Sequence, residues 1–342
     1  MYFLSDEERS FLVGRLLPEI RQQSVHPELR GWNWQQPPLS PVYDVRLTID
    51  EIADQSCDSG RAVYLRRVLS IQEVFSSVAY EAAVLRRALA DLIVGAKRII
   101  YQYGPDGCLA YLATPVPSGA PELLAEGNLA IAKPLDWGPS TSRLLLSDSR
   151  STEERSAVGV VESKRCTREP TTLPEKVAAL TAFERQRFSS RVQDILAREP
   201  GIGVDALVTL ALPVIVERQL SGIFLGLASH LAASAVGSFE GIVFDVRFGE
   251  RQDFHRLTTT ASALLLESMY GQPIDIGCLV YVTFAGERVL VERELHIIDD
   301  ELRQWFIAER DERARLVSEE IDPGLATTCY ATCPFWQHCH PS

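Results

Sequence analysis

The sequence has little of what several protein classes require. It contains 7 cysteines in 342 residues, too few for a disulfide-stabilised scaffold of this length. Its first ten residues include Asp6, Glu7 and Glu8 and no apolar core segment, which argues against a secretory signal peptide. The longest apolar stretch, residues 206–216, is interrupted by Pro213 and is too short to span a bilayer. We therefore expect a cytoplasmic protein that contacts no membrane.

Positive charge is also scarce. The formal net charge is −12, from 34 Lys and Arg residues against 46 Asp and Glu residues. Affinity for nucleic acid needs a local density of cations, so this balance argues against general nucleic-acid binding. It leaves room for a locally basic channel, for which Arg61, Arg66 and Arg67 are the first candidates. The more common meaning of such a run is a solvated helix face.

Several familiar enzyme motifs do not occur in the sequence. It contains no P-loop and no histidine-containing nucleophile triad, and GIGVDALVTL at 201–210 lacks the third glycine of a dinucleotide-binding turn. The composition, 46% hydrophobic and 23% charged, is that of a globular protein with one large core or two coupled ones. The sequence therefore gives no sign of these nucleotide-binding and hydrolase classes.

The most specific feature that is present is a group of three cysteines, Cys329, Cys333 and Cys339, in the run CYATCPFWQHC. In an intracellular chain, closely spaced cysteines are more often metal or cluster ligands than disulfides. A tetrahedral site needs a fourth ligand, and Cys57, far upstream in DQSCDS, is the best candidate. Such a site would join the two ends of the fold.

The fourth ligand and the metal both stay open at this point. His338 and His340 are alternative ligands. Zinc sites favour a gap of two residues within a cysteine pair, whereas the gaps here are three and five. An iron–sulfur cluster tolerates irregular gaps because each thiolate binds a different corner. Of the remaining cysteines, Cys108 and Cys166 show no pattern, and Cys278 in DIGCLVYVTF is expected to pack in a core.

The hydrophobic pattern divides the chain into four segments, 1–50, 51–200, 201–300 and 301–342. The first is expected to hold a helix over 5–23 and an extended arm over 24–50. The second is expected to be helical, with Cys57 near the start of a helix around 50–70 and further helices over 72–95 and 184–199. The last is expected to hold a long helix, capped by Asp299 or Asp300, that leads to the cysteine run.

The segment 201–300 has the texture of a small sheet. Short runs rich in Val, Ile, Leu and Phe indicate strands at 206–218, 220–227, 240–249 and 276–284, and a further edge strand at 289–296. Residues 255–271 indicate a helix between two of these strands, which makes a strand–helix–strand unit.

One of these strands carries a charged pair that suits hydrolytic chemistry. In GIVFDVRFGE, Asp245 and Arg247 are two residues apart and project from the same face of the strand. In a metal-dependent phosphodiesterase such an acid binds Mg²⁺ or Mn²⁺, and the cation orients water or stabilises the charge of the transition state. Taken alone the pair is a weak signal, because a surface ion pair is its usual meaning.

Together, the upstream cysteine, the acid–x–cation strand and the terminal C…CPFW…C run resemble the CRISPR-associated RecB-like nucleases, the Cas-four family. The resemblance is closest to the archaeal-type subfamily labelled Csa. It runs nearly end to end, through the blocks RGWNWQQPPLSPVYDV, RAVYLRRV, FLGLASHLAASAVG, FDVRFGERQDFHRL and IDDELRQWFIAERDE.

The resemblance implies a PD-(D/E)XK nuclease-like α/β fold, a small mixed sheet flanked by helices, with a helical subdomain and a C-terminal cysteine cluster. It implies an iron–sulfur cluster, with four iron and four sulfur atoms, on Cys57, Cys329, Cys333 and Cys339. It also implies a role in CRISPR adaptation, in which DNA fragments with single-stranded ends or overhangs are trimmed or selected before the Cas-one and Cas-two integrase inserts them.

The catalytic pattern of the family is altered in this chain. Tyr80 stands where the family has a histidine, and the neighbouring Glu81 remains. Ser234 aligns with a family aspartate, Asp245 keeps the acid position, and Arg247 replaces a lysine. Arginine stays charged and has a planar fork instead of a compact ammonium. We expect Asp245 and Arg247 to face a cleft beside the helix that carries Tyr80 and Glu81.

These substitutions predict a degenerate nuclease site, so that the protein binds DNA ends and the integrase without efficient cutting. Arg61, Arg66 and Arg67 are the expected DNA contacts, and His255 is expected to contact DNA or the metal. One alternative is an active exonuclease with Mn²⁺ or Mg²⁺, in which a neighbouring carboxylate such as Glu217, Glu240 or Asp253 completes the site. Another alternative, from a different class, is a zinc-stapled scaffold protein with no role on DNA.

Overall fold

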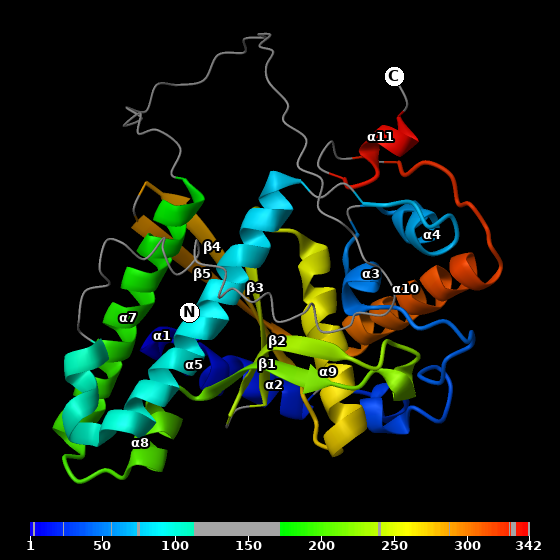
Figure 1. Cartoon of the computed structure of the whole chain (residues 1–342). Helices are drawn as coiled ribbons and strands as arrows, with labels where there is room; N and C mark the ends of the chain where they lie inside the picture. The colour runs from blue at the N-terminus through cyan, green and yellow to red at the C-terminus, as the bar shows by residue number, and fades with distance from the viewer. Residues whose placement is uncertain are drawn as a thin grey trace, which may run out of the picture.

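The computed structural model (Figure 1) describes residues 1–2, 4–22, 24–55, 57–73, 76–112, 172–238, 241–286, 288–327, 329 and 333–340. Its centre is a five-stranded sheet with the strand order β1-β2-β3-β4-β5. The strands are Val214–Leu220, Leu231–Gly237, Ile242–Phe248, Ile276–Ala285 and Arg288–Ile297. Neighbouring strands are antiparallel except for the parallel pair β3 and β4. This mixed sheet, flanked by helices, confirms the expected α/β class.

The parallel pair is connected by helix α9 (Arg256–Tyr270), which follows the short 3₁₀ turn η5 (Asp253–His255). The helix ends at Gly271, whose φ of +66° is the left-handed conformation that glycine adopts readily at a helix C-terminus. The expected strand–helix–strand unit over 240–284 is therefore confirmed. It places the start of α9 directly after the strand that carries Asp245 and Arg247.

The sheet separates two hydrophobic cores, and Figure 1 shows the helices on either side of it. The first core packs β3 residues Phe244 and Val246 against helices that precede the sheet in the sequence. These helices are the π-helical turn η1 (Leu12–Leu16), α2 (Leu17–Gln22), α5 (Ser77–Leu112), α7 (Leu173–Arg198) and α8 (Val204–Ala211). Helix α1 (Asp6–Phe11) leads directly into η1.

The second core packs Val243 of β3 against another set of helices. These are α3 (Ile49–Ala53), α9 and α10 (Asp300–Ser318). The segment between α2 and α3 runs over this core in two 3₁₀ turns, η2 (Pro27–Leu29) and η3 (Gly31–Asn33), and forms a bridge between Leu47 and Leu227. Gly31 is pressed so closely against α9 that a Cβ there would lie 2.1 Å from the carbonyl oxygen of Leu264.

Strands β2 and β3 separate at one end, and this separation positions the charged pair. They pair only over Ala235–Val236 and Val243–Phe244. The next cross-strand position brings Ser234 to Asp245, where a side-chain hydrogen bond takes the place of the backbone ladder. On the other side of β2, strand β1 carries Glu217 at φ +47°, a left-handed conformation rare for a residue with a side chain.

Several element boundaries differ from expectation. The apolar run at 206–218 forms α8 and then β1, and 220–227 forms the end of β1 and the turn η4 (Ile223–Leu225). The hydrophobic pattern did not indicate strand β2, which the family resemblance alone placed at LAASAVG. Cys57 lies between α3 and α4 (Arg61–Arg67) and not in a helix. Among the described residues, no helix is long and apolar enough to cross a membrane.

Candidate functional site

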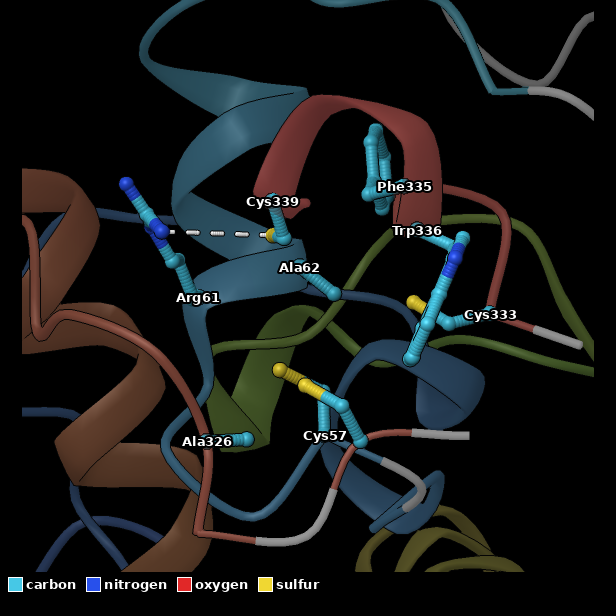
Figure 2. Close-up of a pocket in the computed structure, with 9 residues that line it drawn as sticks. Cys57, Arg61, Ala62, Ala326, Cys333, Phe335, Trp336 and Cys339 are labelled. Carbon is cyan, nitrogen blue, oxygen red and sulfur yellow. Dashed lines mark hydrogen bonds between the residues drawn. The ribbon is translucent and has the colours of Figure 1, made fainter. Parts of the chain in front are cut away.

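Four cysteines from distant parts of the chain line one pocket (Figure 2). The lining residues are Cys57, Arg61, Ala62, Ala326, Cys329, Cys333, Phe335, Trp336 and Cys339. Cys57 and Cys329 are 272 positions apart in sequence (329 − 57). The structure thus brings Cys57 to the three C-terminal cysteines, as the sequence pattern requires. Their role as metal ligands stays a prediction.

A tight turn presents Cys57 to this pocket. The amide of Gly60 donates to the carbonyl oxygen of Cys57 at 3.0 Å, and α4 begins at the next residue. Gly60 has φ +75°, and a Cβ there would lie 2.5 Å from Nη1 of Arg313, a side chain that is itself buried. Glycine is required here for both its backbone conformation and its small size.

Hydrogen bonds hold this turn to the segment that follows α10. They join two stretches of chain more than 250 residues apart, and each uses a short polar side chain or a guanidinium. The bonded pairs are Ser59 Oγ with Gly324 O at 3.1 Å, Asp58 Oδ1 with Thr327 N at 3.2 Å and Arg61 Nη2 with Asp322 Oδ2 at 2.9 Å. These contacts connect the two sides of the pocket.

The C-terminal side of the pocket is a short helical turn, α11 (Trp336–Cys339). The amide of Trp336 donates to Cys333 O at 3.1 Å, and the amide of Cys339 donates to Phe335 O at 3.0 Å. Phe335 is 2% exposed, and the guanidinium of Arg66 lies 5.8 Å from its ring centre. An apolar anchor in the middle of the CPFW run thus fixes the cysteines on either side of it.

The thiols influence one another electrostatically. Burial raises the pKa of Cys333, and the other three cysteines raise it further. Burial also raises the pKa of Cys339, while Arg61 acts in the opposite direction and lowers it. A bound cation would remove the repulsion between the thiolates, while protons compete with it for the same sulfurs.

Neither histidine considered as an alternative ligand lines the pocket. The ring of His340 stacks on Trp336 at 4.1 Å, and His338 is exposed. Within the described ranges, no three His, Cys, Asp or Glu side chains are grouped closely enough to hold one metal ion as they stand. Because neither histidine lines the pocket, the donors that its described lining residues offer are four thiols.

The three arginines of α4 are engaged in ion pairs. Arg61 pairs with Asp322 at 2.9 Å. Arg66 pairs with Glu73, and both Arg66 and Arg67 pair with Glu51, which is 4% exposed. These ion pairs neutralise much of the positive charge that the sequence analysis assigned to DNA binding. The assignment of the three arginines to DNA binding stays a prediction.

Asp245 is a second centre of interest, because it is a charged residue that is only 3% exposed. It accepts a hydrogen bond from Ser234 Oγ at 2.7 Å and another from Arg247 Nε at 2.5 Å. Arg247 also donates to Thr258 Oγ1 of α9 at 2.6 Å. The carboxylate is thus held by a permanent cation and a hydroxyl, both in direct contact.

Additional acids surround Arg247. Burial lowers its pKa, but the charges of Asp245, Asp50 and Asp54 outweigh that effect, so that the net shift is upward. Beside them, burial and the cation of Arg247 lower the pKa of His255 to about 4. His255 is therefore neutral at neutral pH, with its Nδ1 3.2 Å from the hydroxyl of Tyr281.

The expected cleft beside Tyr80 and Glu81 is corrected by the structure. Alternation along β3 turns Asp245 and Arg247 toward α9, while α5 packs on the opposite face of the sheet. Glu81 forms an ion pair with Lys176 of α7 at 2.6 Å, and Tyr80 is 53% exposed. In the part of the chain that is described, no hydrogen bond or ion pair joins either residue to Asp245.

The possible replacement carboxylates lie elsewhere or have other partners. Glu217 pairs with Arg87 at 3.4 Å, and Asp253 is exposed in η5. Glu240 lies outside the described residues. The acids that act on Arg247 besides Asp245 are instead Asp50 and Asp54 of the α3 turn, which sequence reasoning missed. In the sequence, Asp50 and Asp54 are marked only by their spacing of four residues, which is helical. That spacing does not indicate that they lie near Arg247.

Comparisons with known proteins place the chain among relatives of one description. It matches the family described as CRISPR-associated exonuclease Csa1 over residues 1–108 and 141–342. A protein of that name from Saccharolobus solfataricus is 26% identical over 323 residues, which cover 93% of this chain and 94% of that protein. Another of the same name, from Thermoproteus tenax, is 25% identical over 315 residues, covering 92% and 91%. No solved structure matches the chain.

Proposed function

Because the chain belongs to the CRISPR-associated exonuclease Csa1 family, we propose that it handles DNA ends during CRISPR adaptation. Its DNA is a fragment with single-stranded ends or overhangs, and its protein partner is the Cas-one and Cas-two integrase that receives the fragment. The family supports a CRISPR-related exonuclease role, since both similar proteins carry that name. The adaptation step itself rests on the resemblance of the sequence blocks to the Cas-four family.

The first part of the proposal is an iron–sulfur cluster on Cys57, Cys329, Cys333 and Cys339. The residues fit such a group, because the described residues that line the pocket include four thiols and no carboxylate. A cluster binds each thiolate at a separate corner, which suits cysteines that come from separate segments. When bound, the cluster supplies a covalent connection between the turn after α3 and the C-terminal segment, and its binding is coupled to folding.

The second part is a nuclease centre that is largely silent. The observation that carries it is the pair of contacts on Asp245, at 2.5 Å from Arg247 and 2.7 Å from Ser234. The guanidinium competes with a divalent ion for this carboxylate, and Mg²⁺ prefers hard anionic oxygens that Ser234 does not supply. We expect DNA binding that weakens as salt rises, and weak cleavage that is better with Mn²⁺ than with Mg²⁺.

A nuclease assay on single-stranded and splayed DNA tests this part. The wild-type chain is expected to bind both substrates and to cut little with Mg²⁺. The double variant Ser234→Asp, Arg247→Lys supplies a second carboxylate and a compact cation, and should gain Mg²⁺-dependent cutting. Adding Asp245→Asn to it should abolish that gain while DNA binding, measured by fluorescence anisotropy, persists. Efficient Mg²⁺-dependent cutting by the wild type, lost in Asp245→Asn, would establish the active exonuclease instead.

Metal analysis after anaerobic purification tests the first part. We expect iron and acid-labile sulfide in comparable amounts, with a brown colour and a broad visible absorbance band. Zinc in their place, with no DNA binding, would favour the scaffold protein and reject the proposal. Iron without DNA binding would keep the cluster and reject the role in handling DNA ends.

A further inference from the structure

Arg61 is the one charged residue, among those the structure describes, that lines the cysteine pocket. It is the first residue of α4, four positions after Cys57, and its side chain is 19% exposed. Its guanidinium has three nitrogens, and each has a different environment. Nη2 pairs with Asp322 at 2.9 Å, Nη1 lies 4.0 Å from Sγ of Cys339, and Nε is buried with no hydrogen-bond partner among the described residues.

A buried N–H without an acceptor is unusual, because it loses its hydrogen bond to water and gains nothing in return. Here the unpartnered Nε belongs to a side chain that already contacts a cysteine sulfur in the same pocket. Figure 2 shows Arg61 beside Cys339 at the edge of the hollow that the cysteines line. The cation of Arg61 therefore lies at the edge of the pocket, with Nη1 toward the sulfur of Cys339.

We propose that Arg61 is a positioning residue for the centre held by the four cysteines. Its Nη1–H donates to the Cys339 thiolate, and its positive charge lies beside the bound centre. This inference rests on the proposed iron–sulfur cluster. It replaces the expected role of Arg61 as a DNA contact.

The chemistry of the pocket explains why an arginine occupies this position. Four thiolates bring four negative charges into a partly buried site, and a guanidinium stays protonated there at any ordinary pH. Its planar fork makes contacts in two directions at once. Asp322 holds one edge of the fork, and Asp322 is itself fixed by the amide of Gly324 at 2.9 Å. A lysine, with a single ammonium, keeps the charge but cannot make both contacts.

One consequence is a higher reduction potential. When the centre accepts one electron from an external reductant, it becomes one charge more negative, and a fixed cation and N–H···S contacts stabilise that form. Hydrogen bonds to the sulfurs and local charge are among the factors that set the potential of such clusters. Arg61→Gln should therefore lower the midpoint potential, because it removes the cation and the Nη1–H contact with Cys339.

The test is a redox titration of the full chain with dithionite, followed by visible absorbance and by electron paramagnetic resonance. The wild type is compared with Arg61→Gln, Arg61→Lys and Asp322→Asn, and the iron content of each protein is measured. We expect the lowest potential for Arg61→Gln and an intermediate one for Arg61→Lys. Asp322→Asn should shift the potential upward or leave it unchanged, because it removes a negative charge while Arg61 stays. General loosening of the pocket would instead shift all three variants in the same direction.

The outcomes separate this inference from the proposed function. Equal potentials for the wild type and an iron-loaded Arg61→Gln would overturn the role of Arg61 and leave the cluster intact. A downward shift in Asp322→Asn as large as that in Arg61→Gln would also overturn it. If Arg61→Gln retains too little iron to titrate, Arg61→Lys decides, with a lower potential supporting the role and an unchanged one rejecting it. A wild-type chain without iron would reject the cluster itself.

Discussion

Replacing Asp245 by asparagine should make the protein less stable, which is the opposite of what the same change does in many metal sites. In a metal-free site that contains several carboxylates, removing one of them relieves repulsion between like charges and stabilises the fold. In this chain Asp245 is buried and is the direct counterion of Arg247. Asparagine keeps the size of the side chain and removes its charge, so that Arg247 is left as a mostly buried cation with its hydrogen bond to Thr258.

The size of the effect follows from this environment. Removing one partner of a buried ion pair costs about 3–5 kcal/mol. Arg247 is 22% exposed, and Asp50 and Asp54 still act on it, so we take a smaller value of about 2–3 kcal/mol. With about 2.1 cal/mol/K of unfolding entropy per residue, 342 residues give about 0.7 kcal/mol/K. The melting temperature should therefore fall by about 3–4 °C.

The assay is thermal unfolding by circular dichroism in buffer without added divalent ions. Asp253→Asn, which changes an exposed acid in η5, serves as the matched control and should change the melting temperature little. A double-mutant cycle with Arg247→Met isolates the coupling, which should exceed about 1.5 kcal/mol. A melting temperature that rises in Asp245→Asn would refute the reasoning and indicate a carboxylate site prepared for a metal.

Three other changes test separate features. The proposed ligands are Cys57, Cys329, Cys333 and Cys339. Replacing any one of them by alanine should remove most of the iron measured by metal analysis. Cys278→Ala, in the buried strand β4, should leave the iron content unchanged. Gly60→Ala should cost about 1–3 kcal/mol and lower iron content, because its Cβ meets Arg313 and its φ is left-handed; normal iron and melting would contradict this. Burial lowers the pKa of His296 to about 4. Below pH 6.5 the unfolded state therefore binds a proton that the folded state does not bind. The contribution of His296 to the free energy of unfolding is complete above pH 6.5 and falls by about 3 kcal/mol toward pH 4. His296→Gln should flatten the dependence of urea unfolding on pH in that window by about one proton, and an unchanged slope would argue against a neutral buried imidazole.

The elements with strong local signals were predictable. Helix α9 and strand β4 were expected because a helical pattern and a continuous apolar run follow each other with a glycine between them. The run at 206–218 was misassigned because short apolar runs do not distinguish a buried helix from a buried strand by periodicity. Pro213 separates the two in the structure, with α8 ending at Ala211 and β1 beginning at Val214.

Strand β2 shows what local signals cannot provide. Its sequence, LAASAVG, is made mostly of small residues with weak preference for strands, and it is held by pairing with β1 along most of its length. The sites show the same limit. Spacing on one strand revealed that Asp245 and Arg247 share a face, but which face depends on the packing of Val243 against α9. The contact of Arg247 with Thr258 depends on where that helix lies.

The distance along the chain between Cys57 and the other cysteines has a consequence for synthesis in the cell. Residue 57 leaves the ribosome long before residue 329, and at about 5–20 residues per second the 272 intervening positions take about 14–54 seconds. For all of that time one thiol of the pocket exists without its three partners. The proposed cluster therefore cannot be completed during translation of the sheet, and its four ligands are all present only after residue 339 has been made. Loading with iron then reports that the polypeptide from the turn after α3 to the CPFW run has been made and folded.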